Sequence, residues 1–296
     1  MLNKRRRGEG VIIVEATLSN INGDPKRGGE PRTFNDYGLA SDCSLSRKLR
    51  DVVCPGSPVR EEIFGVAKVD PASEGFDIFE RPEVGVQKSR EIINKEGIEA
   101  FHKRFWDARL WGNTLLEEKM DKGSIRTGVF KLSIGMSVAP VEIIIGDCTR
   151  KAPTEEGKSC GMAPDKIKVI RHGIYCFPFS IEFFRMDKNH TCCTQQDIDI
   201  LLSAIPYAYL ATASSTRTDV RIVSAPYVEF NGLGLNLCNL RKSFYPIKRV
   251  AQNISSVSIQ EYEFPGLNNS VVLGIQEKYP DAIAKLIDLC PQEVML

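Results

Sequence analysis

The chain has 296 residues, 42% of them hydrophobic, which is enough to bury a core and excludes a disordered chain. Its 39 basic and 38 acidic side chains give a net charge of +1. A uniformly basic nucleic-acid binder is therefore excluded, and any attraction to nucleic acid must come from local clusters of charge.

Nine cysteines without a CxxC pair fit neither a disulfide framework nor a zinc knuckle, and they favour a reducing cytoplasm. The first apolar run, Val11 to Val14, is shorter than the ~7–15 residues of a secretion signal. No later stretch reaches the ~18 apolar residues of a membrane span. We therefore expect a cytoplasmic protein that does not enter a membrane.

The N-terminal half predicts a strand, a long loop and a helix. Val11–Leu18 has the composition of a buried strand, and residues 19–36, rich in Asn, Gly and Pro, predict a long loop of the kind that is usually functional. A helix is predicted from about Asp42, an acceptable N-cap, with Leu45 and Leu49 on one apolar face.

The segment that follows has a different composition. Residues 54–101 are rich in Pro, Gly and charge, which predicts an insertion that projects from the core. Helical spacing over 91–108 then returns the chain to the core. Strands are predicted at 129–136, 141–146 and 166–177, and the polar stretch from Asp147 to Asp165 predicts the tip of a protruding hairpin.

The last third predicts two helices and two strands. Thr194 and Asp197 have the spacing of a capping box, which predicts a helix to about Tyr209. Strands are expected at 221–229 and 255–261, and a closing helix at 277–289. This order predicts an α+β fold with a split βαβ sheet of the ferredoxin-like or RRM-like kind, carrying insertions.

The loop NINGDPKRGGEPR (Asn20 to Arg32) has the residue types of a phosphate-binding segment. The glycines at 23, 28 and 29 allow close backbone approach to a phosphate. Lys26, Arg27 and Arg32 supply positive charge that releases condensed counterions when a nucleic acid binds. Such a surface would hold a sugar-phosphate backbone without reading bases.

The predicted helix after this loop offers a second group of polar residues. Ser44, Arg47 and Lys48 share the arc opposite the apolar face, with Arg50 at its edge. A hydroxyl and cations near a helix N-terminus can bind a phosphate. The alternative is an ordinary solvated basic face, and the local pattern leaves both open.

A third basic stretch, LRKSFYPIKRV (Leu240 to Val250), interleaves cations with Phe244 and Tyr245. Aromatic and basic residues in alternation suit single-stranded RNA, because bases stack on the rings and phosphates contact the cations. Aromatic residues of this kind more often belong to the edge of a core, and we favour that interpretation here.

Six short blocks occur in an order that is typical of one protein family. They are NINGDP (20–25), PR (31–32), SLSRKLRD (44–51), DARLWG (107–112), TGVF (127–130) and HGIY (172–175). In this order the chain resembles the backbone subunits of type I CRISPR Cascade complexes, members of the RAMP superfamily, and it is most similar to those of types I-B and I-C. Ile21 and Trp111 stand where the family usually has proline and phenylalanine.

The resemblance implies a hand-shaped fold. An RRM-like palm would comprise residues 1–53 and 107–296, with a protruding thumb hairpin at about 144–169, and residues 54–106 would form an inserted finger region. Copies would stack head to tail along CRISPR RNA (crRNA), each thumb flipping out one nucleotide. A heterologous contact that does not close generates such an open filament, and base pairing then reads the target.

The resemblance also implies which residues face the RNA. Arg32, Ser44, Arg47 and Lys48 would do so on the palm, with Arg150 and Met162 on the thumb, Met162 as an apolar wedge, and Arg171 beyond it. Together with the basic residues of the loop and helix, and with Arg126 and Lys131 beside the TGVF block, the expected RNA-binding set is Lys26, Arg27, Arg32, Ser44, Arg47, Lys48, Arg50, Arg126, Lys131, Arg150, Met162 and Arg171.

We expect crRNA, target DNA bound through the guide, further copies of the chain, and the large, small and crRNA-end capping subunits of Cascade as partners. No cofactor, metal or enzymatic activity is expected. Two alternatives remain open. Type III relatives cut target RNA with a thumb aspartate, which here would be Asp147 or Asp165. A stand-alone RRM-like binder of single-stranded RNA would need exposed aromatics on its central strands, a pattern that the predicted strands lack. A histidine-dependent ribonuclease is disfavoured because His102, His172 and His190 form no evident pair.

Overall fold

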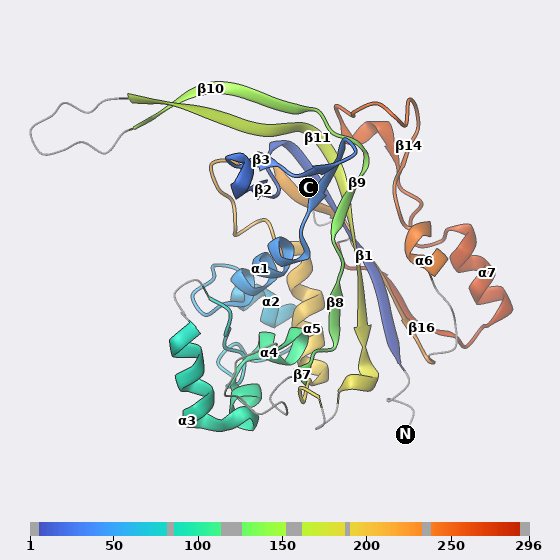
Figure 1. The fold of residues 1–296 in the computed structure, drawn as a ribbon. Helices are drawn as coiled ribbons and strands as arrows, with labels where there is room; N and C mark the ends of the chain where they lie inside the picture. Colours follow the sequence, from blue (N-terminus) through green and yellow to red (C-terminus); the bar gives the residue numbers. More distant parts are fainter. Residues whose placement is uncertain are drawn as a thin grey trace, which may run out of the picture.

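The fold is built around one long antiparallel sheet, seen here in a computed structural model that describes residues 6–81, 86–113, 126–151, 162–186, 190–232 and 238–290. Strand β1 (Arg7–Ser19) lies in the middle, between β11 (Met162–Glu182) on one side and β12 (Val220–Ser224) and β13 (Pro226–Phe230) on the other (Figure 1). The expected mixture of helices and strands around one sheet is confirmed.

The ten-stranded sheet has the order β16-β13-β1-β11-β9-β5-β4, with β10 and β8 also paired to β11 and β12 to β1. The remaining members are β16 (Ile283–Asp288), β9 (Gly135–Pro140), β5 (Tyr37–Ala40), β4 (Thr33–Phe34), β8 (Phe130–Leu132) and β10 (Ile143–Lys151). Among the described residues, three two-stranded pairs lie outside it: β2 (Gly23–Asp24) with β3 (Glu30–Pro31), β6 (Gly112–Asn113) with β7 (Arg126–Thr127), and β14 (Ile247–Lys248) with β15 (Tyr262–Glu263).

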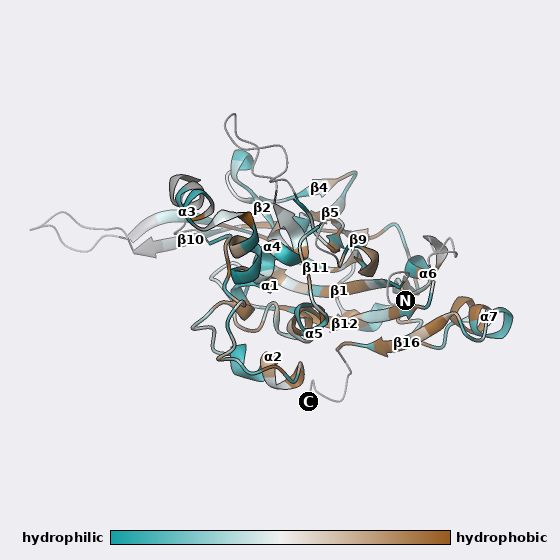
Figure 2. Cartoon of the chain, turned by 90° about the horizontal axis from the view of Figure 1, so that it is seen from below, coloured by the Kyte–Doolittle hydropathy of each residue, from teal (hydrophilic) through white to brown (hydrophobic). Residues whose placement is uncertain are grey.

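Successive side chains of a strand point to opposite faces of the sheet. A hydrophobic cluster covers each of these faces. Ile12 and Val14 of β1 join the larger hydrophobic cluster, which includes residues of α1 (Asp42–Val53) and α5 (Gln195–Ala204). Val11 and Ile13 join a smaller cluster with residues of α6 (Cys238–Ser243) and α7 (Ser270–Lys278). Brown, hydrophobic segments accordingly lie along β1 and β16 in Figure 2.

Two predicted helix starts are confirmed, each with a capping contact. The side chain of Thr194 accepts from the N–H of Asp197 at 3.2 Å, which is the expected capping box of α5. At α1 the cap is Ser41 and not Asp42, since Ser41 Oγ accepts from the N–H of Ser44 at 3.2 Å.

The expected projection of the insertion is wrong for its first part. Ile63 and Phe64 of α2 (Arg60–Val66), with Phe76 and Ile78 after it, belong to the larger hydrophobic cluster. The predicted return helix is confirmed as α3 (Val86–Arg104), which is kinked at Gly97, followed by α4 (Trp106–Trp111). Apolar residues spaced among Pro, Gly and charge therefore reach the core although the composition resembles that of a surface loop.

Two predictions for the C-terminal region are wrong. Residues 255–261 are not a strand of the sheet, because Ser258 and Glu261 form a capping box that starts a 3-10 turn (Ile259–Glu261). The predicted helix at 277–289 does not form either. Helix α7 ends at Lys278, just before Pro280, which cannot continue a helix, and the edge strand β16 follows.

A two-stranded hairpin arm (residues 143–151 of β10 and 162–170 of β11) projects from the sheet (Figure 1). Both strands of the arm extend into the range 147–165 expected for its tip, β10 to Lys151 and β11 from Met162, and residues 152–161 of that prediction lie outside the described residues. Asp147 lies opposite Lys166, and Cys148 opposite Asp165. Opposite charges at facing positions stabilise an antiparallel pair, so polar composition here did not end the strands. In the described part of the chain, no helix is long and apolar enough to cross a membrane.

Candidate nucleic-acid interface

The basic turn (residues 20–32) is fastened to the base of the hairpin arm. Asn20 donates from Nδ2 to the carbonyl of Gly29 at 2.7 Å and to that of Lys168 in β11 at 3.1 Å. Lys168 donates from Nζ to the carbonyl of Arg27 at 3.3 Å, and its Nζ lies 3.3 Å from Oε1 of Glu30. These contacts set the position of the turn relative to the arm.

The glycines of the basic turn are required by its backbone. Gly28 and Gly29 have φ angles of 60° and 81°, in the left-handed region that favours glycine. Asp24 accepts from the N–H of Lys26 at 3.0 Å and caps the 3-10 turn Pro25–Arg27. Lys26 and Arg27 are exposed on this turn. That its glycines also admit a phosphate stays a prediction.

The basic turn contacts the start of α1, so these two predicted groups lie together. The N–H of Ser41 donates to Oδ1 of Asn22 at 2.9 Å. Arg32 follows in the same turn, half-exposed, with its guanidinium 3.9 Å from Asp24. In Figure 1 the turn and α1 are adjacent, on the side from which the arm projects.

The outward arc of α1 carries two of the predicted cations. Arg47 is 36% exposed; its Nε lies 2.7 Å from Asp51, and its Nη1 donates to the carbonyl of Glu80 at 3.0 Å. Lys48 is 12% exposed and 3.9 Å from the same Asp51. One carboxylate therefore serves two cations.

A third cation, Arg217, joins Arg47 and Lys48 to form what we call the basic cluster. Burial and the positive charge of Arg217 lower the pKa of Lys48, with Arg47 adding to the effect and Asp51 opposing it. The turn that carries Arg217 lies against the basic turn, since the N–H of Asn20 donates to the carbonyl of Thr216 at 2.7 Å. Repelling cations next to one another favour a bound anion.

Sequence reasoning missed Arg217. It stands in the polar turn SSTRTD (residues 214–219), whose composition is that of any surface turn. Only the pairing of β12 with β1 brings this turn to α1, more than 160 residues earlier in the chain. No local pattern gave a signal for it.

The assignment of Arg50 to the solvent-facing arc is wrong. Its side chain is 7% exposed, and its Nε and Nη2 lie 3.2 Å from Asp107 and 3.0 Å from Glu80. Its guanidinium also packs over the ring of Trp111, 4.4 Å from the centroid. Arg50 therefore holds α1 to the inserted segment. The helical wheel could not show this, because the acidic partner Asp107 is 57 residues away.

The other predicted residues are dispersed. Arg126 in β7 and Lys131 in β8 lie at the end of the sheet away from the basic turn (Figure 1), and burial lowers the pKa of Lys131. Arg171 is half-exposed and 3.1 Å from Glu142. The backbones of Arg150 and Met162 lie in the two strands of the arm, opposite Ala163 and Lys151.

The stretch 240–250 lies at the edge of the core, which is the interpretation that its sequence favoured. Phe244 is buried, and Arg241 lies 3.2 Å from the buried Glu9. The buried Lys248 donates to the carbonyls of Ala251 at 3.0 Å and Ile254 at 2.6 Å. Arg241 and Lys248 are therefore used in contacts inside the protein, whereas Lys242 and Arg249 are exposed.

His172 lies in a buried polar network. Its Nδ1 contacts Ser256 Oγ at 2.7 Å and its Nε2 contacts Glu15 at 3.2 Å, while Tyr262 donates to Ser256 at 2.8 Å. His172 and Ser256 are each 1% exposed, so a substrate could not reach them. The network links β1 and β11 to the C-terminal region and gives His172 a structural role.

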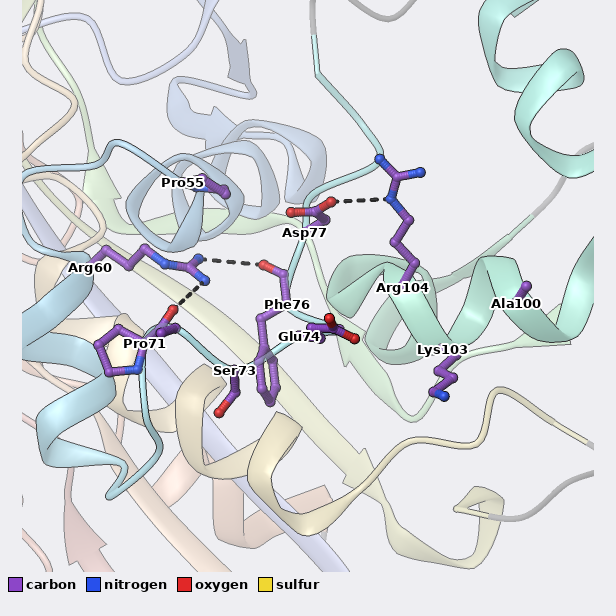
Figure 3. A pocket seen from close by; sticks show the side chains of 12 residues that line it. Pro55, Arg60, Pro71, Ser73, Glu74, Phe76, Asp77, Ala100, Lys103 and Arg104 are labelled. Carbon is purple, nitrogen blue, oxygen red and sulfur yellow. Dashed lines mark hydrogen bonds and ion pairs between the residues drawn. The ribbon is translucent and has the colours of Figure 1, made fainter. Parts of the chain in front are cut away.

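A cavity of about 630 Å³ opens in the inserted segment (Figure 3). The guanidinium of Arg60 donates to the carbonyls of Pro71 and Phe76, both at 3.4 Å, and Arg104 lies 3.2 Å from Asp77. These paired groups hold the cavity walls together. We take the basic cluster as the candidate nucleic-acid site, because one carboxylate, Asp51, accompanies its three cations, whereas Glu74 and Asp77 accompany the three cations of the cavity.

Comparisons with known proteins give one family. The family model described as CRISPR-associated protein Cas7 matches residues 6–262. Among solved structures, the chain is similar to one from a "CRISPR RNA-guided surveillance complex, pre-nicking" (15% identity, TM-score 0.46, 75% of this chain and 78% of that chain). It is also similar to one from a "CRISPR RNA-guided surveillance complex" (12%, 0.44, 95% and 87%). A third comes from a type III-B Cmr-beta complex bound to cognate target RNA (9%, 0.39, 74% and 60%). A search of the curated proteins finds no match.

Proposed function

The chain belongs to the family of CRISPR-associated protein Cas7, and from that membership we propose that it is a non-catalytic, crRNA-binding backbone subunit of a type I surveillance complex. Copies of it would line the guide RNA head to tail, together with large, small and crRNA-end capping subunits. Target DNA would be recognised by base pairing to the guide.

The observation that carries this proposal is the basic cluster. Arg47 and Lys48 share Asp51 on α1, and the positive charge of Arg217, on the turn that contacts the basic turn, lowers the pKa of Lys48. A phosphate between the cations would relieve their repulsion and would release condensed counterions. Such a site binds any sequence, as a subunit that coats a guide requires.

The sheet supports an RRM-like palm. Its order β13-β1-β11-β9, with α1 and α5 contributing to the same hydrophobic cluster, is the order of a split βαβ sheet. We assign residues 1–53 and 107–296 to this palm, the arm to a thumb at about 144–169, and residues 54–106 to a finger region, part of which packs into the palm's core.

Head-to-tail assembly predicts that bound copies increase with RNA length. On single-stranded RNAs of increasing length, analytical ultracentrifugation should give complexes whose protein-to-RNA ratio rises in steps, because each copy covers a fixed stretch and offers a free end to the next. The protein without RNA serves as the control for self-association. One protein per RNA at every length would contradict the assembly.

The proposal also predicts that target RNA stays intact. The assembled complex, incubated with complementary RNA and Mg²⁺, should leave the strand uncut, since a backbone subunit of this kind supplies shape and charge only. Denaturing gel electrophoresis would show whether the RNA strand is intact. Regularly spaced cuts that vanish when Asp147 or Asp165 is replaced by alanine would overturn the non-catalytic assignment and favour a type III-like ribonuclease.

A further inference from the structure

Asp107 in the DARLWG block is a buried carboxylate that the proposed RNA interface does not use directly. Its side chain is 1% exposed. Oδ1 accepts from the N–H of Phe79 at 2.8 Å, and Oδ2 accepts from the N–H of Glu80 at 3.0 Å and from Nε of Arg50 at 3.2 Å. One carboxylate therefore fixes two successive peptide groups of the inserted segment against α1.

Glu80 connects this carboxylate to the basic cluster. Its carbonyl accepts from Nη1 of Arg47 at 3.0 Å, and its carboxylate lies 3.0 Å from Nη2 of Arg50. The other anchor of Arg47 is Asp51 on the next turn of α1. The guanidinium of Arg47 is thus held at two points, and the position of one of them depends on Asp107.

We propose that Asp107 is a positioning residue for RNA binding, acting through the backbone of Glu80 to preorder Arg47; the inference rests on the proposed RNA-binding function. A long exposed side chain loses conformational freedom when it binds, and holding it beforehand reduces that loss. A guanidinium held from one side still offers N–H groups to a phosphate on the other, because its donors form a rigid planar fork.

The inserted segment has a second anchor, whose effect on the position of residue 80 must be distinguished from that of Asp107. The ring of Phe79 packs against Phe101 and Phe105, with centroid distances of 4.7 and 5.3 Å. If these rings alone place residue 80, loss of the Asp107 carboxylate will leave Arg47 in position.

A double-mutant cycle on binding to single-stranded oligouridylate tests the proposal. Asp107→Asn should lower the affinity roughly 10-fold, because the amide cannot accept from both peptide N–H groups and Arg50. In an Arg47→Ala background the same substitution should change affinity less than about twofold, since the group that it positions is gone. Asp107→Asn should also speed hydrogen exchange at the amides of Phe79 and Glu80.

Asp77→Asn is the matched control. Asp77 lies in the same segment and pairs with Arg104 at 3.2 Å, outside the contacts of Glu80, so RNA affinity and exchange at Glu80 should stay at the level of the unmodified protein. Equal losses from Asp107→Asn with and without Arg47 would overturn the positioning role. If Arg47→Ala itself leaves RNA binding unchanged, the proposed interface fails instead, so the two failures are distinguishable.

If Asp107→Asn does not fold, Arg47→Lys still tests whether the preordering of Arg47 matters for RNA binding. Lysine keeps the charge but not the planar fork, so it cannot hold both Glu80 and Asp51 while facing a phosphate. The expected result is at least about half of the free-energy loss seen for Arg47→Ala. Affinity equal to that of the unmodified protein would show that preordering is unimportant and would overturn the inference.

Discussion

Replacing Arg47 and Lys48 together with alanine should weaken binding to single-stranded RNA roughly 100-fold at about 0.1 M salt, because hydrogen bonds from charged groups to phosphate are the strong ones. The log–log salt slope should become shallower by about 1.4, at roughly 0.7 per lost phosphate contact. Fluorescence anisotropy over a series of salt concentrations measures both quantities.

The matched control removes two lysines elsewhere. Lys278 at the end of α7 and Lys285 in β16 are exposed and lie across the sheet from α1 (Figure 1). The double variant Lys278→Ala and Lys285→Ala changes the net charge by the same amount. Its RNA affinity and salt slope should equal those of the unmodified protein. Equal slopes for both double variants would mean that the RNA responds only to total charge, and the basic cluster would not be its seat.

Gly128→Ala should destabilise the fold by at least about 3 kcal/mol, because the new Cβ has no room. It would lie 2.2 Å from the carbonyl oxygen of Leu110, 2.2 Å from the carbonyl carbon of Trp111 and 2.3 Å from the nitrogen of Gly112. All three are backbone atoms, so α4 and the β6–β7 pair would have to separate. Thermal unfolding followed by circular dichroism should show a midpoint lower by roughly 10 °C.

Gly65→Ala in α2 is the control for this prediction. A Cβ at Gly65 would meet no atom within 4 Å, and alanine is favoured over glycine inside a helix by about 0.5–1 kcal/mol. This variant should unfold at the same temperature or slightly higher. An unchanged midpoint for Gly128→Ala would mean that α4 and β7 are not packed as closely as described.

Local patterns predicted the elements whose causes are local. The apolar composition of β1, the apolar face of α1 and the capping box before α5 each depend on residues a few positions apart, and all three are confirmed. The prediction for the C-terminal region was wrong because two local signals compete there. Helical spacing over 277–289 is interrupted by Pro280, and strand formation at the edge of the sheet prevails.

The candidate site was predictable only in part, because its geometry depends on distant partners. Only residues 33–41 separate the basic turn from α1, so their proximity followed from the chain. Arg50 was misplaced because its partner Asp107 is far along the chain, and Arg217 was missed because only strand pairing brings it to Lys48. Helical periodicity shows which side of a helix is polar but cannot show what covers that side.

Strand β11 serves both the sheet and the arm, and this has a mechanical consequence. Its pairing with β1 ends at Ile170, opposite Ser19, whereas its pairing with β10 continues outward to Met162. The contacts of Lys168 with the basic turn hold the base of the arm. We therefore expect a displacement of the outer end of the arm to be transmitted along β11 to the basic turn and to the centre of the sheet.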